Sequence, residues 1–248
     1  MTHTQVTTCS GFCPRCNTHH QLTTSGLAEI RAKKLIEEFE TKGVLDIFSA
    51  TPKLSIESLF SDARGKMFGV LECDDNGQTI FLYAFSGQFC GLWDVEGWAP
   101  PLFDIDQWYK ANHFNERRIK KLTSHITHCM QLNTQSHIIA ALKKRRKRLS
   151  QNLMRQIHDL YTVHSFHKKN EKLTDAFLFP QKIPTGTGDC CAPKLLNMAH
   201  KKGLTPISIS EFFFGYTNKS GTKHHNQFYS SCTAKCAPLL GYMLCPLH

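Results

Sequence analysis

The residues of this sequence best suited to chemistry are two adjacent cysteines at the start of an expected helix. They lie in the segment Gly186-Thr-Gly-Asp-Cys-Cys-Ala-Pro-Lys-Leu-Leu196. Its two glycines allow a turn and Asp189 is a suitable N-cap, so we expect Cys190 and Cys191 in the first helical turn. Free N–H groups and partial positive charge there favour the thiolate, the form of cysteine that attacks carbon or binds a metal.

A second pair of cysteines lies further along the chain, after a predicted strand. Residues 206–214 are mostly apolar with Glu211 in their middle, which is typical of a buried strand. Ser231 is a suitable N-cap for a last helix that starts at Cys232 and contains Cys236. Because both helices would start beside the same strand, we expect their first turns to meet at one edge and form one metal site.

Two ligand sets fit this arrangement. Both sets share three thiolates, from Cys190, Cys232 and Cys236. The fourth ligand would be the thiolate of Cys191 or the imidazole of His225. Both sets are typical of zinc, which is therefore the expected cofactor. The zinc site would be structural or catalytic, and cysteines that only pack in the core are the alternative without a metal.

Two kinds of enzyme are compatible with these residues. The helix–strand–helix plan resembles zinc-dependent nucleobase deaminases, in which a glutamate on the first helix transfers protons. Ala192 occupies the position of that glutamate and the second cysteine pair is separated by three residues instead of two, so Glu211 would have to supply the carboxylate. In the other enzyme, a cysteine hydrolase, Cys190 would be the nucleophile, His225 the base and Glu211 the group that orients the base.

The N-terminus contains a second group of metal-ligating residues. Cys13 and Cys16 have the spacing of half a zinc knuckle, and His19 and His20 follow closely. Cys9 could complete a set of four ligands. The alternative is a frayed terminus with free thiols.

The positive charge of the chain is concentrated in one segment. The net charge is +10, and residues 113–170 contain 13 Lys and Arg against two acidic residues, a local net charge of +11. Consecutive cations repel one another unless an anion is bound, so we expect this segment to contact the phosphates of a polyanion without sequence specificity. The alternative is a solvated helix face. The side chains expected to bind phosphate, and RNA if the family resemblance described below holds, are Arg117, Arg118, Lys120, Lys121, Lys143, Lys144, Arg145, Arg146, Lys147 and Arg148.

Composition indicates a folded protein of a reducing compartment. The hydrophobic and charged fractions, 41% and 20%, are ordinary for a globular protein. The sequence contains no apolar run that could span a membrane and no signal peptide, which predicts a cytoplasmic protein without a membrane partner. Its 11 cysteines are then expected to be metal ligands, reactive thiols or core residues rather than disulfides.

Periodicity predicts an α+β fold: a small antiparallel sheet, an inserted basic antiparallel helical hairpin of coiled-coil type, and a Cys-rich C-terminal helix–strand–helix unit. The expected elements before that unit are a helix over residues 26–41, strands over 67–73, 79–85 and about 89–93, and two helices within 115–166 that join near residue 133. The first helix is expected to bury Leu27, Ile30, Leu35 and Phe39. Cys73 and Cys90 fall in expected strands and should pack in the core. The expected units are residues 1–24 (Cys/His-rich), 25–112 (α+β with the β-hairpin), 113–170 (basic hairpin) and 171–248 (Cys-rich).

Eight segments resemble the N-terminal accessory region of the long RluA-type pseudouridine synthases. In order, they are Gly65-Lys-Met-Phe-Gly-Val-Leu71, Ala84-Phe-Ser-Gly87, Pro100-Pro-Leu-Phe-Asp104, Leu142-Lys-Lys-Arg-Arg-Lys-Arg-Leu-Ser150, the segment of residues 186–196 quoted above, Gly203-Leu-Thr-Pro-Ile207, Glu211-Phe-Phe-Phe-Gly215 and His225-Asn-Gln-Phe-Tyr-Ser-Ser-Cys-Thr-Ala-Lys-Cys-Ala-Pro-Leu-Leu240. The resemblance singles out Cys190, Glu211, His225, Cys232 and Cys236. Cys191 stands where the family often has Ala, which favours His225 or a water as the fourth ligand.

The resemblance implies association with RNA modification but not isomerisation of uridine by this chain. The His-Arg-Leu-Asp segment that carries the catalytic Asp of the synthases is absent from the sequence. We therefore expect a zinc-binding accessory module that binds structured rRNA or tRNA through the helical hairpin. Whether it is an enzyme stays open. One alternative is a deaminase-like or cysteine hydrolase centred on Cys190, Glu211 and His225, and another is a protein-binding subunit that serves a pseudouridine synthase in trans.

Overall fold

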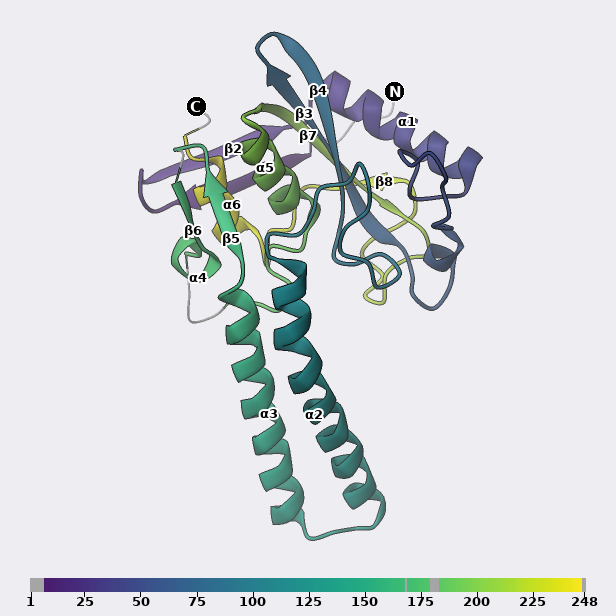
Figure 1. Cartoon of the computed structure of the whole chain (residues 1–248), viewed down its shortest axis with the longest axis vertical. Coiled ribbons are helices and arrows are strands. Elements are labelled where there is room, and N and C mark those ends of the chain that lie inside the picture. Colours follow the sequence, from purple (N-terminus) through teal and green to yellow (C-terminus); the bar gives the residue numbers. More distant parts are fainter. Residues whose placement is uncertain (1–6, 168, 179–182, 247–248) are drawn as a thin grey trace.

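The computed structural model of the chain describes residues 7–167, 169–178 and 183–246, and it has the α+β architecture that the sequence predicts (Figure 1). The helices are α1 (Gly26–Lys42), α2 (Ile105–Gln131), α3 (Ser136–His158), α4 (Leu173–Ala176), α5 (Cys191–Lys202) and α6 (Ala237–Leu244), with a 3₁₀ turn at Glu57–Phe60. The strands are β1 (Thr8–Cys13), β2 (Thr18–Thr23), β3 (Lys66–Asp75), β4 (Gln78–Phe85), β5 (Thr162–Ser165), β6 (Lys169–Lys172), β7 (Thr205–Phe214) and β8 (Gln227–Phe228).

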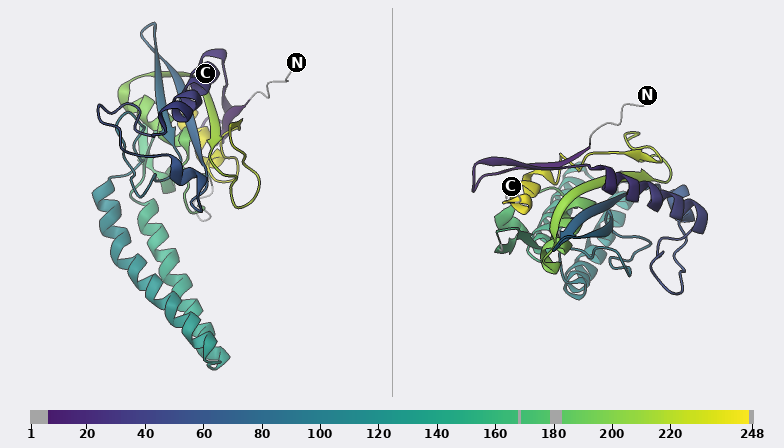
Figure 2. Two further views of the ribbon diagram at one scale, coloured as in Figure 1. Left: turned by 90° about the vertical axis from the view of Figure 1, so that its right-hand side faces the viewer. Right: turned by 90° about the horizontal axis from the view of Figure 1, so that it is seen from above.

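The central sheet has the strand order β4-β3-β7-β8, and its neighbouring strands are antiparallel. Figure 2 shows α1 lying against one side of this sheet, and α5 packs on the other side. Successive side chains of a strand point to opposite faces. In β7, Phe212 and Phe214 therefore pack beneath α1, whereas Ile209 and Glu211 lie on the α5 face. This alternation places the only carboxylate of β7 on the same face as the cysteines of α5.

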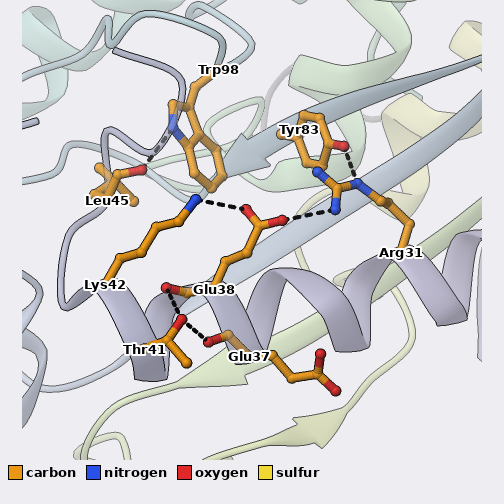
Figure 3. A network of polar contacts seen from close by, with 8 residues as sticks. All are labelled: Arg31, Glu37, Glu38, Thr41, Lys42, Leu45, Tyr83 and Trp98. Atoms are coloured by element: carbon orange, nitrogen blue, oxygen red, sulfur yellow. Dashed lines mark hydrogen bonds and ion pairs between the residues drawn. The ribbon is translucent and has the colours of Figure 1, made fainter. Parts of the chain in front are cut away.

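Polar contacts hold α1 against the sheet and fix the loop that follows the helix (Figure 3). Arg31 donates from Nη1 to Glu38 Oε1 at 3.0 Å and from Nε to the hydroxyl of Tyr83 in β4. Trp98, which follows β4, donates from Nε1 to the carbonyl oxygen of Leu45 in the loop after α1, at 3.2 Å. An aromatic core fills the space between α1 and the sheet, so this face serves stability.

The ends of α1 agree with the prediction, but its buried face does not. Ser25 is the N-cap and Gly43 ends the helix with a φ of 67°. The side chains that face the core are Ala28, Ala32, Leu35, Ile36 and Phe39. Leu27 and Ile30 are 50% and 64% exposed, so the prediction that they are buried is wrong. The small alanines let the helix lie close to the sheet, and the helical repeat then turns the two larger side chains outward.

The β-hairpin is confirmed, whereas the strand expected after it is not. Asn76 and Gly77 have φ values of 52° and 93°, which is the geometry of a two-residue hairpin turn. Residues 89–93 form a tight turn instead of a strand, closed by backbone hydrogen bonds between its first and fourth residues. Cys73 is buried as expected, but Cys90 has a φ of 48° in this turn and is exposed.

The helices α2 and α3 form the expected antiparallel hairpin, which projects from the rest of the molecule in Figure 1 and in the left view of Figure 2. The helix α2 begins at Ile105, ten residues earlier than expected, because the Asp104 carboxylate caps it by accepting the Gln107 N–H at 2.8 Å. After His158 the chain forms β5 and β6, where the prediction had continued the helix. In the described part of the chain, no helix is apolar enough over a sufficient length to cross a bilayer.

The elements α5, β7 and α6 confirm the predicted helix–strand–helix unit, with small shifts at the helix starts. The N-cap of α5 is Cys190 rather than Asp189. The N-cap of α6 is Cys236, because residues 233–236 form turns before the helix begins. Each helix thus has a cysteine at the position whose side chain lies closest to its free N–H groups.

The predicted units are interleaved in space. The strand β7, from residues 171–248, pairs with β3, from residues 25–112. The β1–β2 hairpin packs on α6 through its backbone, since a Cβ atom added at Gly11 would lie 2.3 Å from the carbonyl oxygen of Ala237. Both ends of the described chain therefore contribute to the cysteine-rich region.

Candidate metal centres and RNA interface

Three of the predicted cysteine ligands come together at the helix starts. The Sγ atoms of Cys190, Cys232 and Cys236 all lie within 4.8 Å of one another, and we name this group the three-cysteine centre. Cys190 comes from the N-cap of α5 and Cys236 from the N-cap of α6. The turn that precedes α6 is closed by the Cys236 N–H, which donates to the carbonyl oxygen of Cys232 at 3.2 Å. This turn brings the third thiol back to the other two.

The three-cysteine centre stabilises thiolate charge. Hydrogen bonds from the thiols of Cys190 and Cys236, and from the backbone N–H groups of Lys235 and Cys236, hold the pKa of Cys232 far below its ordinary value. The pKa of Cys190 is raised, first by its hydrogen bonds to Cys232 and Cys236 and then by burial. The charge of one thiolate therefore opposes ionisation of the neighbouring thiols. A divalent cation would neutralise the repulsion and allow all three thiols to ionise.

A cavity of about 460 Å³ opens beside the three-cysteine centre. It is lined by Cys190 and Cys232 and also by Glu211 of β7, whose side chain is almost completely buried. The hydroxyl of Ser231 donates a hydrogen bond to Glu211 Oε1. Burial raises the pKa of Glu211 to about 7. The cavity thus combines two thiols of the three-cysteine centre with a carboxyl group that can gain or lose a proton near neutral pH.

A buried lysine supports the wall of this cavity. Lys194, one helical turn after Cys190, is fully buried, and its Nζ donates to the carbonyl oxygens of Phe85 at 3.0 Å and Gly87 at 2.9 Å. These bonds fix the segment that contains Ser86, a lining residue. Sequence reasoning missed this role because lysines are seldom buried. The signal was a lysine inside an otherwise apolar helical turn.

The two residues considered as fourth ligands lie outside the three-cysteine centre. The Nδ1 atom of His225 accepts the Gly215 N–H at 3.0 Å, and its ring packs on Phe60 and Phe214. Cys191 is buried under β3, and its thiol donates to the carbonyl oxygen of Met67 at 3.3 Å. Among the described residues, the cluster therefore offers three protein ligands, and His225 is not placed with Cys190 as a base.

A second cluster contains four ligands. The ligating atoms of Cys13, Cys16, His20 and Cys245 all lie within 4.8 Å of one another, and we name them the four-ligand centre. The Sγ atom of Cys16 lies 3.0 Å from His20 Nε2 and 3.5 Å from the Sγ atom of Cys245. This group can hold a metal ion, as the spacing of Cys13 and Cys16 predicts.

The β1–β2 hairpin determines which histidine belongs to the four-ligand centre, and the end of α6 supplies the remaining cysteine. Neighbouring residues of a strand face opposite sides, so in β2 His20 is buried towards Cys16 while His19 is exposed and lies near the ring of Phe12. The structure thus selects His20 and leaves His19 out. Cys9 lies elsewhere in the core, and burial raises the pKa of its thiol to about 12. Its place is taken by Cys245, for which the sequence offers no local spacing signal.

The cations of the hairpin lie on the surface, as predicted. The side chains of the ten expected RNA-binding residues are exposed, except that Arg146 is half-buried. Lys120 pairs with Glu116 at 2.8 Å, and within the described ranges none of the other nine has an acidic partner within 4.0 Å. Arg118 and Lys121 of α2 and Arg145 of α3 line one groove between the helices, together with His125. We name these four residues the basic groove.

Comparisons of the chain with family models, with curated proteins and with solved structures found no match.

Proposed function

We propose that this protein is an RNA-associated zinc protein whose three-cysteine centre carries out hydrolytic deamination of a nucleobase. The observation that carries the proposal is the cavity in which Cys190, Cys232 and the buried Glu211 meet. A closed structural zinc site uses four protein ligands, whereas catalytic zinc sites use three and keep one position for water or substrate. The three-cysteine centre offers three protein ligands among the described residues, and two of them, Cys190 and Cys232, line the cavity.

The donor set fits zinc, because three thiolates, two of them at helix N-caps, prefer a soft divalent ion with tetrahedral geometry. A bound zinc ion supplies Lewis-acid activation of water. The carboxyl group of Glu211 would accept a proton from the attacking water and deliver it to the departing amino group. The oxygen of water thereby replaces the exocyclic amine, and ammonia leaves.

The source of the carboxylate is the main difference from the deaminase plan of the sequence analysis. Ala192, at the expected position on the first helix, is fully buried in the core and cannot transfer a proton. Glu211 reaches the same cavity from β7 and is oriented by the Ser231 hydroxyl. A carboxyl with a pKa near 7 is well matched to both steps of proton transfer.

RNA is the proposed substrate. The exposed cations of α2 and α3 have few acidic partners, which favours binding of phosphates. The resemblance to the accessory region of RluA-type pseudouridine synthases supports rRNA or tRNA as the RNA and suggests a pseudouridine synthase as a partner in trans. Both the phosphate contacts and the cavity would be needed to bring a base out of a structured RNA to the centre.

The test is the conversion of bases in RNA. Zinc-loaded protein is incubated with a pool of structured rRNA and tRNA, and the digested nucleosides are measured by mass spectrometry for replacement of an amine by a carbonyl. The expected result is conversion of cytidine or adenosine that disappears in Cys232→Ser and persists in the control Cys191→Ala. Unchanged nucleosides, with zinc present in the three-cysteine centre and RNA bound, would instead favour an RNA-binding module with a structural zinc.

A further inference from the structure

The helix α6 carries a cysteine of a different cluster at each end. Its N-cap is Cys236, of the three-cysteine centre, and its C-cap is Cys245, of the four-ligand centre. An eight-residue helix is about 12 Å long, so the two clusters are close but separate. We infer that the four-ligand centre is a closed structural zinc site, and that its zinc fixes α6 and thereby strengthens metal binding at the three-cysteine centre. The second part rests on the proposed function, whereas the first part stands without it.

The four-ligand centre has the composition of a structural zinc site. Its ligands are three thiolates and one imidazole, all from protein, which is the Cys₃His set of closed tetrahedral sites. Cys13, His20 and Cys245 are buried, and Cys16 is held in the hairpin turn. Four ligands leave no position for a substrate. The site therefore differs in kind from the three-cysteine centre.

The surroundings of the four-ligand centre tie three segments together. Arg15, between two of the ligands, forms an ion pair with Glu171 of β6, and its guanidinium lies 4.7 Å from the ring centroid of Tyr242 in α6. The Tyr242 hydroxyl donates to the carbonyl oxygen of Lys169 in β6 at 3.3 Å. The His167 N–H donates to the carbonyl oxygen of Cys245 at 3.2 Å. A metal here would therefore fix the end of α6 to both the β1–β2 and the β5–β6 hairpins.

A second connection joins the two centres through β1. At its far end, the Ser231 N–H donates to the carbonyl oxygen of Thr8 at 3.0 Å, and the Thr8 N–H donates to Ser230 Oγ at 3.1 Å. Ser231 precedes the ligand Cys232 and also orients Glu211. The strand β1 thus runs from the edge of the three-cysteine centre to Cys13 of the four-ligand centre.

The strand and the helix are locked to each other between these ends. A Cβ atom added at Gly241 would lie 2.1 Å from the carbonyl oxygen of Phe12, and one added at Gly11 would lie 2.4 Å from the backbone nitrogen of Gly241. Backbones that touch directly cannot shift independently. Loss of the metal at one end of this pair of elements would therefore loosen the ligands at the other end. Outer contacts of this kind typically change metal affinity about 10–100-fold.

The experiment measures zinc per chain and the affinity of each site on the full chain. Zinc content is determined for the wild type, Cys16→Ser, Cys245→Ser, Cys232→Ser and the control Cys90→Ser, whose exposed thiol belongs to neither centre. We expect two zinc ions per chain in the wild type and in Cys90→Ser, and one zinc ion per chain in each of the other three variants. In titrations against a chromophoric chelator, the zinc that Cys16→Ser retains should bind about 10-fold more weakly or worse than the corresponding zinc of the wild type. The variant His20→Cys also alters this centre but keeps four ligands, so it should retain the zinc content and the affinity of the wild type. This control separates loss of a ligand from a general loss of folding.

The outcomes that overturn each part are distinct. If Cys16→Ser and Cys245→Ser each held as much zinc as the wild type, the four-ligand site would be overturned. Loss of one zinc in Cys16→Ser, with unchanged affinity of the other, would overturn the coupling. If Cys232→Ser kept its full zinc content while Cys16→Ser lost all of it, the proposed function would fail and the four-ligand site would stand.

Discussion

Gly69 lies directly opposite Glu211 in the β3–β7 ladder. A Cβ atom at Gly69 would lie 2.8 Å from the Cβ atom of Cys191 and 3.4 Å from the Cγ atom of Glu211. Glycine is required here by a close approach, since its lack of a side chain lets the first turn of α5 rest on the sheet. The same contact brings the thiol of Cys190 towards the strand that carries the carboxylate.

The first prediction concerns this contact. Gly69→Ala should destabilise the protein by about 1–3 kcal/mol, because the added methyl group overpacks against Cys191 and Leu195. It should also weaken zinc binding at the three-cysteine centre by displacing Cys190. Urea unfolding and chelator titration measure the two effects. The control is Gly26→Ala, where the added atom meets nothing within 4 Å and the stability should be unchanged or slightly higher. Equal stabilities of the two variants would contradict the role of Gly69.

The second prediction concerns RNA binding by the basic groove. Affinity for a structured rRNA or tRNA fragment should fall steeply with salt, because each phosphate contact releases counterions. Replacing Arg118, Lys121 and Arg145 together by serine should lower the slope of log K against log salt by about 2–3. Fluorescence anisotropy over a salt series measures this slope.

The matched control for that prediction removes the same charge elsewhere. Lys201, Lys202 and Lys219 are exposed and lie outside α2 and α3, so their replacement by serine should leave the slope nearly unchanged. An equal loss of slope in both triple variants would show that net charge alone drives binding, against a defined interface.

The third prediction concerns stability at acidic pH. Burial lowers the pKa of His158, whose Nε2 atom is buried without a hydrogen-bond partner in the described structure. The unfolded chain then binds a proton near pH 6.5 that the folded chain does not, so stability is lost as pH falls through about 6.5. Between about pH 7.5 and pH 5, urea unfolding should show a smaller loss of stability for His158→Gln than for the wild type. The exposed residue His113 provides the control, and His113→Gln should follow the wild type. Parallel curves for all three proteins would contradict the prediction.

Local patterns in the sequence predict much of the fold and part of the site. Ser25 and Gly43 bound α1, the turn at residues 76 and 77 fixes the β-hairpin, and cysteines at two helix starts give the three-cysteine centre. These features depend on residues a few positions apart, and such spacing is visible in one dimension.

Features that depend on long-range packing were missed. Cys245 joins Cys16 across more than two hundred residues, which no spacing rule reveals. His225 is a good ligand by type, but its Nδ1 atom is already engaged by a backbone N–H of its own loop. Leu27 and Ile30 have the apolar character of core residues, yet the contact surface of α1 is centred on its alanines.

The most direct test of the central claim is the rate of base conversion by Glu211→Gln compared with its zinc content. Glutamine keeps the size of the side chain and can still accept the hydrogen bond of Ser231, but it cannot transfer a proton. We predict a rate about 10²–10⁴-fold below that of the wild type with unchanged zinc per chain. Conversion at the wild-type rate by the zinc-loaded Glu211→Gln protein would contradict the account.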